Sequence, residues 1–239
     1  MNSQFGDQYK LNPVFSDHPG NFRKQSFIED EEKRLLREQP VRPETISYYE
    51  KVLLSGTNAE NLPVVGIFCN MIPPELILSM GAVPLRLDCG NSASAILGEE
   101  ILSGDICPLA KATFGQFLRK DSPANRCQVL ILPSSCDAKR KMAQTLNDYK
   151  PVFMLNLPPE KQHTRYGEQV YAEFQRLIAF LEKHLQARIS KKKLKASIQD
   201  SRERSLLIRQ IQDERIREPR SLSMPDFFLI IQSMLFGTA

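Results

Sequence analysis

The sequence predicts an α/β fold in which a parallel, Rossmann-like sheet is flanked by helices. Between residues 61 and 160, short runs of apolar and β-branched residues alternate with segments of helical character. These runs lack the strict apolar–polar alternation of a half-exposed strand, which indicates strands buried on both faces. Prolines and glycines separate the runs from the helices. Together these observations favour a sheet wrapped on both sides by crossover helices.

Each element follows from a local signal. The predicted strands are LPVVGIFC (62–69), VPLRLDCG (83–90), QVLILPSSCD (128–137) and PVFMLNLPP (151–159). The segment PPELILSMGA predicts a short helix, because prolines open it and Gly81 follows its last apolar residue. Further helices are predicted over residues 96–103, 108–119 and 138–147.

The chain divides into three predicted parts. Residues 1–60 form an N-terminal arm followed by helices over 26–39 and 44–54, the first opened by a capping-box pattern at Ser26 and Glu29. Residues 61–160 form the Rossmann-like lobe. Residues 161–239 are helical, with long helices over 164–186 and 190–217. The segment 227–236 is very apolar and requires something to bury against.

Composition excludes several classes of protein. The 239 residues carry 32 Lys and Arg against 28 Asp and Glu, and this net charge of +4 does not indicate nucleic acid. The basic stretch from Lys183 to Arg204 is interpreted as a solvated helix face with i,i+4 ion pairs, in preference to an anion-binding face. No apolar run is long enough for a membrane helix, and the polar N-terminus is unlike a signal peptide. A cytoplasmic protein is therefore expected.

The cysteines leave two interpretations open. The chain has five, at positions 69, 89, 107, 127 and 136. An odd number without a signal peptide argues against a disulfide framework, and no CxxC pair supports a zinc ribbon or a thioredoxin-type site. The thiols are either inert and buried, or a subset converges on a soft metal or an iron–sulfur cluster.

Ligands of open α/β sheets bind at the carboxyl ends of the strands. Cys136 follows the third predicted strand, and Cys107 precedes Pro108 at the start of a predicted helix. A thiolate at a helix N-terminus is stabilised by the helix dipole. Cys107 and Cys136 are therefore the best candidate metal ligands, although two thiolates alone do not hold a cluster.

Several neighbouring side chains have ordinary structural interpretations. Arg86 is expected to form an ion pair near Asp88 in preference to contacting a phosphate, and Lys111 is expected at the surface. Asp137 is expected to accept backbone hydrogen bonds in its turn. Ser134 and Ser135 are expected to cap the helix that follows.

Four ordered motifs carry a family resemblance. GIFCNMIPPELILSMGAVPLRL, DICPLAKATFG, VLILPSSCDAKRKM and PVFMLNLP, the last followed by a long helix and RISKKKLKASI, are similar to the 2-hydroxyglutaryl-CoA dehydratase D-component family. This family includes subunits of 2-hydroxyacyl-CoA dehydratases and benzoyl-CoA reductases. The resemblance covers roughly residues 48 to 217, and its specificity lies in the order of the motifs.

The resemblance implies two Rossmann-like lobes and a [4Fe–4S] cluster bound by three cysteines, two of which match Cys107 and Cys136. Glu75 matches an acidic residue near the acyl-CoA site and would hydrogen-bond the substrate or move a proton. Cys69 matches a cysteine often found before this motif and is not assigned as a ligand. The implied partners are a homologous second subunit or completing chain, an ATP-dependent iron–sulfur activator protein, and an acyl-CoA substrate. The implied reaction is a lyase or reductase step through one-electron reduction of the thioester.

The chain departs from the family pattern after Cys136, because no later cysteine can match the third ligand, which lies in the second lobe. The second lobe is expected to be missing here, and His163 and His184 are poor substitutes as ligands. The favoured hypothesis is an iron–sulfur subunit, or part of one, of an enzyme. The alternatives are a non-catalytic interaction or regulatory protein that keeps the first lobe without a cluster, and an unrelated small-molecule α/β domain. A nucleotide-using enzyme is not supported, because the phosphate-binding glycine motifs are absent.

Overall fold

The computed structural model describes residue 48 and residues 62–236, except 89–91, 120–121, 160, 162–163 and 220. The N-terminal arm and the two helices predicted over 26–39 and 44–54 therefore lie outside the described residues, apart from Tyr48. The division into three parts at residues 60 and 160 stays a prediction.

A four-stranded parallel sheet forms the centre of the described structure. Its order is β2-β1-β3-β4, with β1 at Val64–Ile67, β2 at Val83–Arg86, β3 at Val129–Pro133 and β4 at Val152–Leu155. The two central strands, β1 and β3, are buried along their whole length, and the two edge strands are only partly buried. This difference confirms the α/β prediction, because continuous apolar runs suit strands that are covered on both faces.

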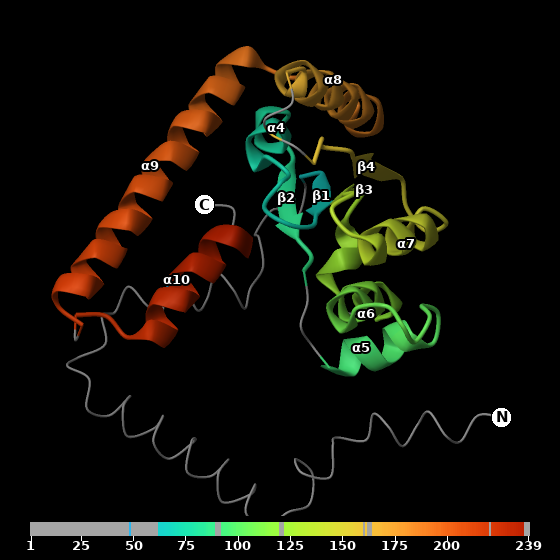
Figure 1. Ribbon diagram of the computed structural model, residues 1–239. Coiled ribbons are helices and arrows are strands. Elements are labelled where there is room, and N and C mark those ends of the chain that lie inside the picture. The colour runs from blue at the N-terminus through green and yellow to red at the C-terminus, as the bar shows by residue number, and fades with distance from the viewer. Residues whose placement is uncertain are drawn as a thin grey trace, which may run out of the picture.

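Helices cover both faces of the sheet (Figure 1). They are α4 Pro74–Ser79, α5 Ser92–Glu99, α6 Pro108–Gly115, α7 Asp137–Leu146, α8 Tyr166–Leu185, α9 Lys191–Arg217 and α10 Met224–Phe236, with 3-10 turns η1 Gln116–Leu118 and η2 Pro123–Arg126. α4 and α8 lie on one face, and α6 and α7 lie on the other, where α5 packs on α6.

The two faces have separate apolar cores, since successive residues of a strand point to opposite sides. Val64, Leu130 and Leu132 point toward α6 and α7, where they meet Phe114 and Met142. On the other face, the strands pack against α4 and α8, with these members fully or almost fully buried: Val65, Val129, Ile131, Ile77, Leu177 and Leu181. The sheet therefore separates two apolar cores, one on each of its faces.

One helix begins earlier than its sequence predicts. The prediction placed a helix over 96–103, whereas α5 spans Ser92–Glu99. The reason is tertiary packing against α6 at two glycines. A Cβ on Gly98 would lie 2.1 Å from the carbonyl oxygen of Lys111, and a Cβ on Gly115 would lie 1.8 Å from that of Ser94. The two glycines let the helix backbones touch, and this contact outweighs the low helix propensity of a Ser- and Gly-containing segment.

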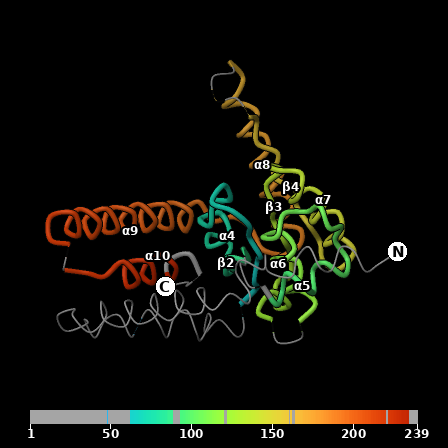
Figure 2. The backbone as a smooth tube through the Cα atoms, turned by 60° about the horizontal axis from the view of Figure 1, so that its bottom comes forward, coloured from blue at the N-terminus to red at the C-terminus, as the bar shows by residue number. Residues whose placement is uncertain are grey.

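The C-terminal helices form an arm beside the sheet. α9 contacts α4 near the start of α9 and runs away from the sheet, and α10 then runs back toward the sheet, where it contacts β2 (Figures 1 and 2). Ser190 caps α9 by accepting a hydrogen bond from the Lys193 N–H at 3.3 Å. α9 has no buried residue, and its Arg204–Asp200 pair at 2.8 Å is the predicted i,i+4 pairing on a solvated face. No helix in the described part of the chain is long and apolar enough to span a bilayer.

Candidate functional site

The topology of the sheet defines where a ligand would bind. From β1 the chain crosses to β2 on one side and then returns to form β3 on the other side, so the order reverses between β1 and β3. In open α/β sheets the crevice at the carboxyl ends of such a strand pair is the usual binding place. Phe68 and Cys69 follow β1, and the turn that contains Cys136 follows β3.

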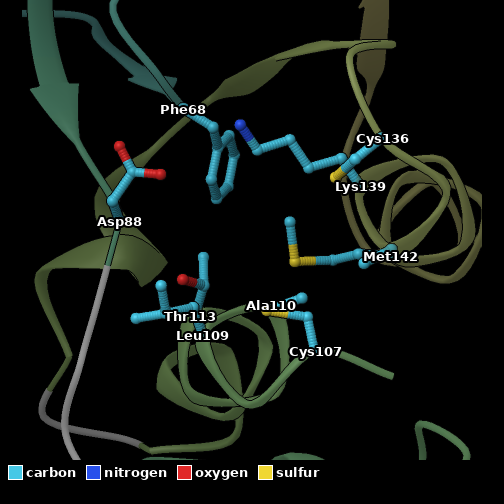
Figure 3. A pocket seen from close by; sticks show the side chains of 10 residues that line it. Phe68, Asp88, Cys107, Leu109, Ala110, Thr113, Cys136, Lys139 and Met142 are labelled. Carbon is cyan, nitrogen blue, oxygen red and sulfur yellow. The ribbon is translucent and has the colours of Figure 1, made fainter. Parts of the chain in front are cut away.

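The two predicted ligand cysteines meet at this edge. Cys107 occupies the N-cap position of α6 and Cys136 that of α7, and neither helix has a side-chain cap. Both residues are exposed, and both line one pocket of about 280 Å³. Figure 3 shows the two side chains reaching this pocket from the two helix starts. The structure thus places Cys107 and Cys136, which are 29 positions apart in the sequence, at one pocket.

The pocket is lined mainly by apolar groups. Phe68 comes from the end of β1, Leu109 and Ala110 from the first turn of α6, and Met142 from α7. Polar lining comes from Thr113, Asp88 and Lys139. An apolar cavity with few polar groups and two thiols is suited to hold a small apolar ligand beside a soft metal.

Asp88 is held in place by two donors. Its Oδ2 atom accepts hydrogen bonds from the Cys69 backbone N–H at 2.9 Å and from the Arg86 Nε at 2.8 Å. The second bond confirms the predicted pairing of Arg86, which also contacts Asn70. Cys69 has a φ of 73°, an uncommon backbone conformation for a residue other than glycine, and the Asp88 bond stabilises it there.

A shallower hollow adjoins the Cys107 side of the pocket. Asp105 forms an ion pair with Lys141 at 3.6 Å, which links the loop before α6 to α7. The pKa of the Asp105 carboxyl is lowered, first by the hydrogen bond from Ser103 at 2.5 Å and then by the charge of Lys141.

The remaining predicted ligands and site residues lie elsewhere or outside the described residues. Glu75 lies in the first turn of α4, a helix of the opposite face, and does not line the pocket, so its catalytic role stays a prediction. On that same opposite face the ring centroids of His184 and Phe180 lie 4.4 Å apart, with the ring planes tilted by 46°. Cys89 and His163 are outside the described residues.

Cys127 is a buried thiol, as expected if the cysteines are structural. Its side chain is 1% exposed in the core beneath α6 and α7. Burial raises its pKa to about 12. A thiol of this kind is neither a nucleophile nor a metal ligand at neutral pH.

Three expectations about neighbouring residues were wrong. Lys111 is not at the surface: it is 2% exposed, and its Nζ donates to the Glu99 carboxylate and to the Gly104 carbonyl, both at 2.9 Å. Asp137 does not accept the expected backbone hydrogen bonds: its side chain is 93% exposed, and its Oδ1 lies 3.9 Å from an Arg140 guanidinium nitrogen. Ser134 and Ser135 do not cap α7, since Cys136 takes the N-cap position.

The sequence reasoning also missed Lys139, which lines the pocket from the first turn of α7. Its signal was present, since Lys139 follows Cys136 by three positions and therefore lies one helical turn away on the same face. Asp88 was named only as a partner of Arg86, yet it also lines the pocket.

The pocket provides a partial set of ligands. Among the described residues, no group of three or more His, Cys, Asp or Glu side chains is placed to hold a metal ion. The two thiols fit a soft metal by their chemistry and position, but further ligands would have to come from outside the described part of the chain.

A four-stranded parallel sheet with two exposed cysteines near its switch point defines a Rossmann-like lobe. The family comparison identifies the class: residues 69–239 match the model of the 2-hydroxyglutaryl-CoA dehydratase D-component. The chain belongs to this family, as its ordered motifs predicted.

One relative is the Escherichia coli (strain K12) protein named "Putative dehydratase subunit YjiM". It is 30% identical over 139 residues, which make up 57% of this chain and 36% of the relative. The aligned part thus spans about a third of the relative's length.

Proposed function

We propose that this chain is an iron–sulfur subunit, or part of one, of a 2-hydroxyacyl-CoA dehydratase-like or benzoyl-CoA reductase-like system. Membership of the D-component family supports an acyl-CoA enzyme system. The single observation that carries the proposal is the meeting of Cys107 and Cys136 in one pocket at the switch point of the sheet. The partners would be a second homologous subunit or completing chain, an ATP-dependent activator protein and an acyl-CoA ester.

Cys107 and Cys136 would hold a [4Fe–4S] cluster as two of its protein ligands, and a completing chain or the rest of the protein would supply the others. When bound, the cluster would supply one electron to the acyl-CoA thioester and a Lewis-acidic iron. Both thiols stand at helix N-termini, where the helix dipole favours negative charge. The chain therefore presents two sulfur ligands where an anionic cluster is best tolerated.

The protein's own residues would position the acyl group and keep water away from it. Phe68, Leu109 and Met142 give the pocket its apolar walls. Such walls displace water from an acyl chain and strengthen the polar interactions that remain. Glu75 would act as an acid, base or hydrogen-bond partner only if the substrate extends from the pocket across the sheet edge to α4.

A second candidate function is a non-catalytic interaction or regulatory protein that keeps the lobe without a cluster. The incomplete ligand set among the described residues favours it. The helix α9 favours it too, because its 27 residues include none that is buried and are therefore accessible to a partner protein.

The deciding experiment measures iron and acid-labile sulfide per chain after anaerobic reconstitution. Wild type is compared with Cys107→Ala, Cys136→Ala and the matched control Cys127→Ala, which removes a buried thiol outside the pocket. We expect about four iron atoms per chain, or about four per two chains for a bridged cluster, lost in the first two variants and retained in the third.

Iron that survives in both pocket variants would contradict the ligand assignment. The absence of iron in every sample, including samples with the homologous subunit added, would favour the non-catalytic alternative. Visible absorption spectra of the same samples distinguish a cluster from adventitious iron.

A further inference from the structure

We propose that Lys111 is a positioning residue for Cys107: its buried ammonium fixes the loop that leads into this cysteine and so holds the thiol at the pocket. Lys111 lies in α6, one helical turn after Cys107, and it does not line the pocket itself. The inference rests on the proposed function in taking Cys107 as a metal ligand. It adds a residue that acts on the metal site through the position of a ligand.

The burial of Lys111 is unusual for a lysine. Its side chain is 3% exposed, whereas the flexible stem of a lysine normally keeps the charged head in water. Burial of an ammonium costs free energy unless charged and polar partners replace the lost water. The partners of Lys111 therefore hold it in this place, and it holds them in return.

The partners of Lys111 belong to the segment that precedes α6. Its Nζ donates to the Glu99 carboxylate and to the Gly104 carbonyl oxygen, both at 2.9 Å. Glu99 is the last residue of α5, and Gly104 lies three positions before Cys107. The Lys111 backbone N–H also donates to the Cys107 carbonyl oxygen at 3.1 Å. One residue thus contacts the segment 99–107 at its start, past its middle and at its end.

The charge of Lys111 also suits its place beside α5. This helix ends at Glu99 and has no basic residue in its last turn, where the helix dipole favours a cation. The Lys111 ammonium supplies that cation from the neighbouring helix α6, whose backbone meets α5 at Gly98 (Figure 1). The segment between the two helices is therefore bound by a charged group as well as by the chain.

A second link to the same segment is weaker. Asp105 pairs with Lys141 of α7 at 3.6 Å, but these side chains are 73% and 53% exposed. Exposed pairs contribute little to stability, because water screens both charges. The pair between Lys111 and Glu99 is shorter, and its ammonium is enclosed. Of the two lysines, Lys111 is therefore the one that fixes the position of Cys107.

A fixed loop matters for a metal site that takes its ligands from two helices. Cys107 and Cys136 bind one metal only if each helix start holds its thiol at the pocket. Loss of an outer contact that orients a ligand usually lowers metal affinity by about 10- to 100-fold. Lys111 should therefore change metal binding without contacting the metal.

The test titrates the metal-free chain with Cd²⁺, a soft ion that can bind two thiolates and complete its coordination with water. The ultraviolet charge-transfer band of the cadmium–thiolate bonds reports how many thiols bind. In wild type we expect a two-thiolate band, which should be diminished in Cys107→Ala and Cys136→Ala and retained in Cys127→Ala. Lys111→Met should weaken Cd²⁺ binding by about tenfold.

Three further variants separate a positioning role from a general loss of stability. Lys150→Met removes a half-buried lysine that also donates to a loop carbonyl, that of Asn125 at 3.0 Å, but lines neither hollow at Cys107. It should leave the Cd²⁺ affinity unchanged. Lys111→Arg retains the charge and the donors, and should restore the affinity to within about threefold of wild type.

The third variant, Glu99→Gln, retains Lys111 and its bond to Gly104 but removes the partner charge at a side chain that is 46% exposed. It should weaken Cd²⁺ binding by about threefold, and it carries the test if Lys111→Met does not fold.

Hydrogen exchange of the metal-free proteins measures the loop directly. In Lys111→Met the amides of residues 103–107 should exchange about tenfold faster, while those of α7, which begins after Cys136, keep their wild-type rates. Unchanged Cd²⁺ affinity in folded Lys111→Met or in Glu99→Gln would overturn the proposal. A wild type without the two-thiolate band would also overturn it, because Cys107 would then not be held within reach of Cys136.

The Cd²⁺ titration does not depend on the iron assay above. Two-thiolate Cd²⁺ binding that requires Lys111, in a chain that takes up no iron, would contradict the cluster and retain the positioning role. Iron uptake that is the same in wild type and Lys111→Met, together with equal Cd²⁺ affinity, would retain the cluster and contradict the positioning role.

Discussion

At the scale of single residues, the cysteines of this chain divide by environment. Cys107 and Cys136 are exposed at helix starts, whereas Cys127 is enclosed by the core beneath α6 and α7. The thiols of Cys107 and Cys136 are thus accessible to reagents and ligands, whereas the thiol of Cys127 is not. Desolvation is the physical cause, because a buried thiolate loses its hydration without gaining a compensating partner.

The buried thiol gives a prediction about stability in alkali. The native pKa of Cys127 is about 12, above the ordinary thiol value of 9.0. Between these two values the folded state retains a proton that the unfolded state releases, so stability falls as the pH rises from about 9 toward 12. Wild type should therefore lose more unfolding free energy over this range than Cys127→Ala, which has no thiol to titrate. Urea titrations of both proteins across the range measure the difference.

Native-state alkylation tests the same assignment independently. Iodoacetamide at pH 8 should modify Cys107 and Cys136 and leave Cys127 unmodified until urea unfolds the chain. Parallel pH curves for wild type and Cys127→Ala, together with rapid native modification of Cys127, would show that the thiol is accessible.

At the scale of elements, the contact between α5 and α6 depends on two glycines. Alanine at Gly98 or Gly115 would place its Cβ inside van der Waals contact of the facing backbone. Backbone cannot rotate away as a side chain can, so the helices would have to separate. The loss would include part of the cover over Phe114, which is fully buried.

We expect Gly98→Ala and Gly115→Ala each to lower the unfolding free energy by about 1–3 kcal/mol, the usual cost of overpacking. Gly167→Ala is the matched control. It too lies in a helix, but nothing lies within 4 Å of the added Cβ, so the higher helix propensity of alanine should stabilise by up to about 1 kcal/mol. Thermal or urea unfolding measures all three. Destabilisation of the same size at Gly167, where the added Cβ meets nothing, would contradict the assignment of the cost to the α5–α6 contact.

The elements also show how far the sequence alone leads. β1, β3, α7 and α9 were predicted within a few residues, because apolar runs, prolines and Ser190 marked their bounds locally. α5 was misplaced, since the close contact at Gly98 is a property of two helices and not of one segment. Cys107 and Cys136 were predicted from strand and helix ends. Lys139 was missed although its spacing from Cys136 placed it one helical turn away, whereas Asp88 became a pocket residue only once β2 was placed in space.

At the scale of the whole molecule, the sheet divides the lobe into two cores that share the same strands. Leu146 of α7 is fully buried on the pocket face, and Leu181 of α8 is fully buried on the other. β1 and β3 contribute alternate residues to both cores, so neither face can lose its packing without weakening the strands that serve the other. The lobe should therefore unfold as one cooperative unit.

Leu146→Ala and Leu181→Ala test whether the two cores unfold together. Each should lower the unfolding free energy by about 2–5 kcal/mol, as large-to-small changes in a core do. Because the sheet separates the two sites, the double variant should lose the sum within about 0.5 kcal/mol. All three should show a single transition by urea denaturation, followed by both circular dichroism and tyrosine fluorescence, whereas Tyr171→Ala, at a side chain that is 67% exposed, should match wild type. Two separate transitions in Leu181→Ala would mean that α8 and its core unfold on their own, and the pocket face would then be an independent folding unit that carries both cysteines.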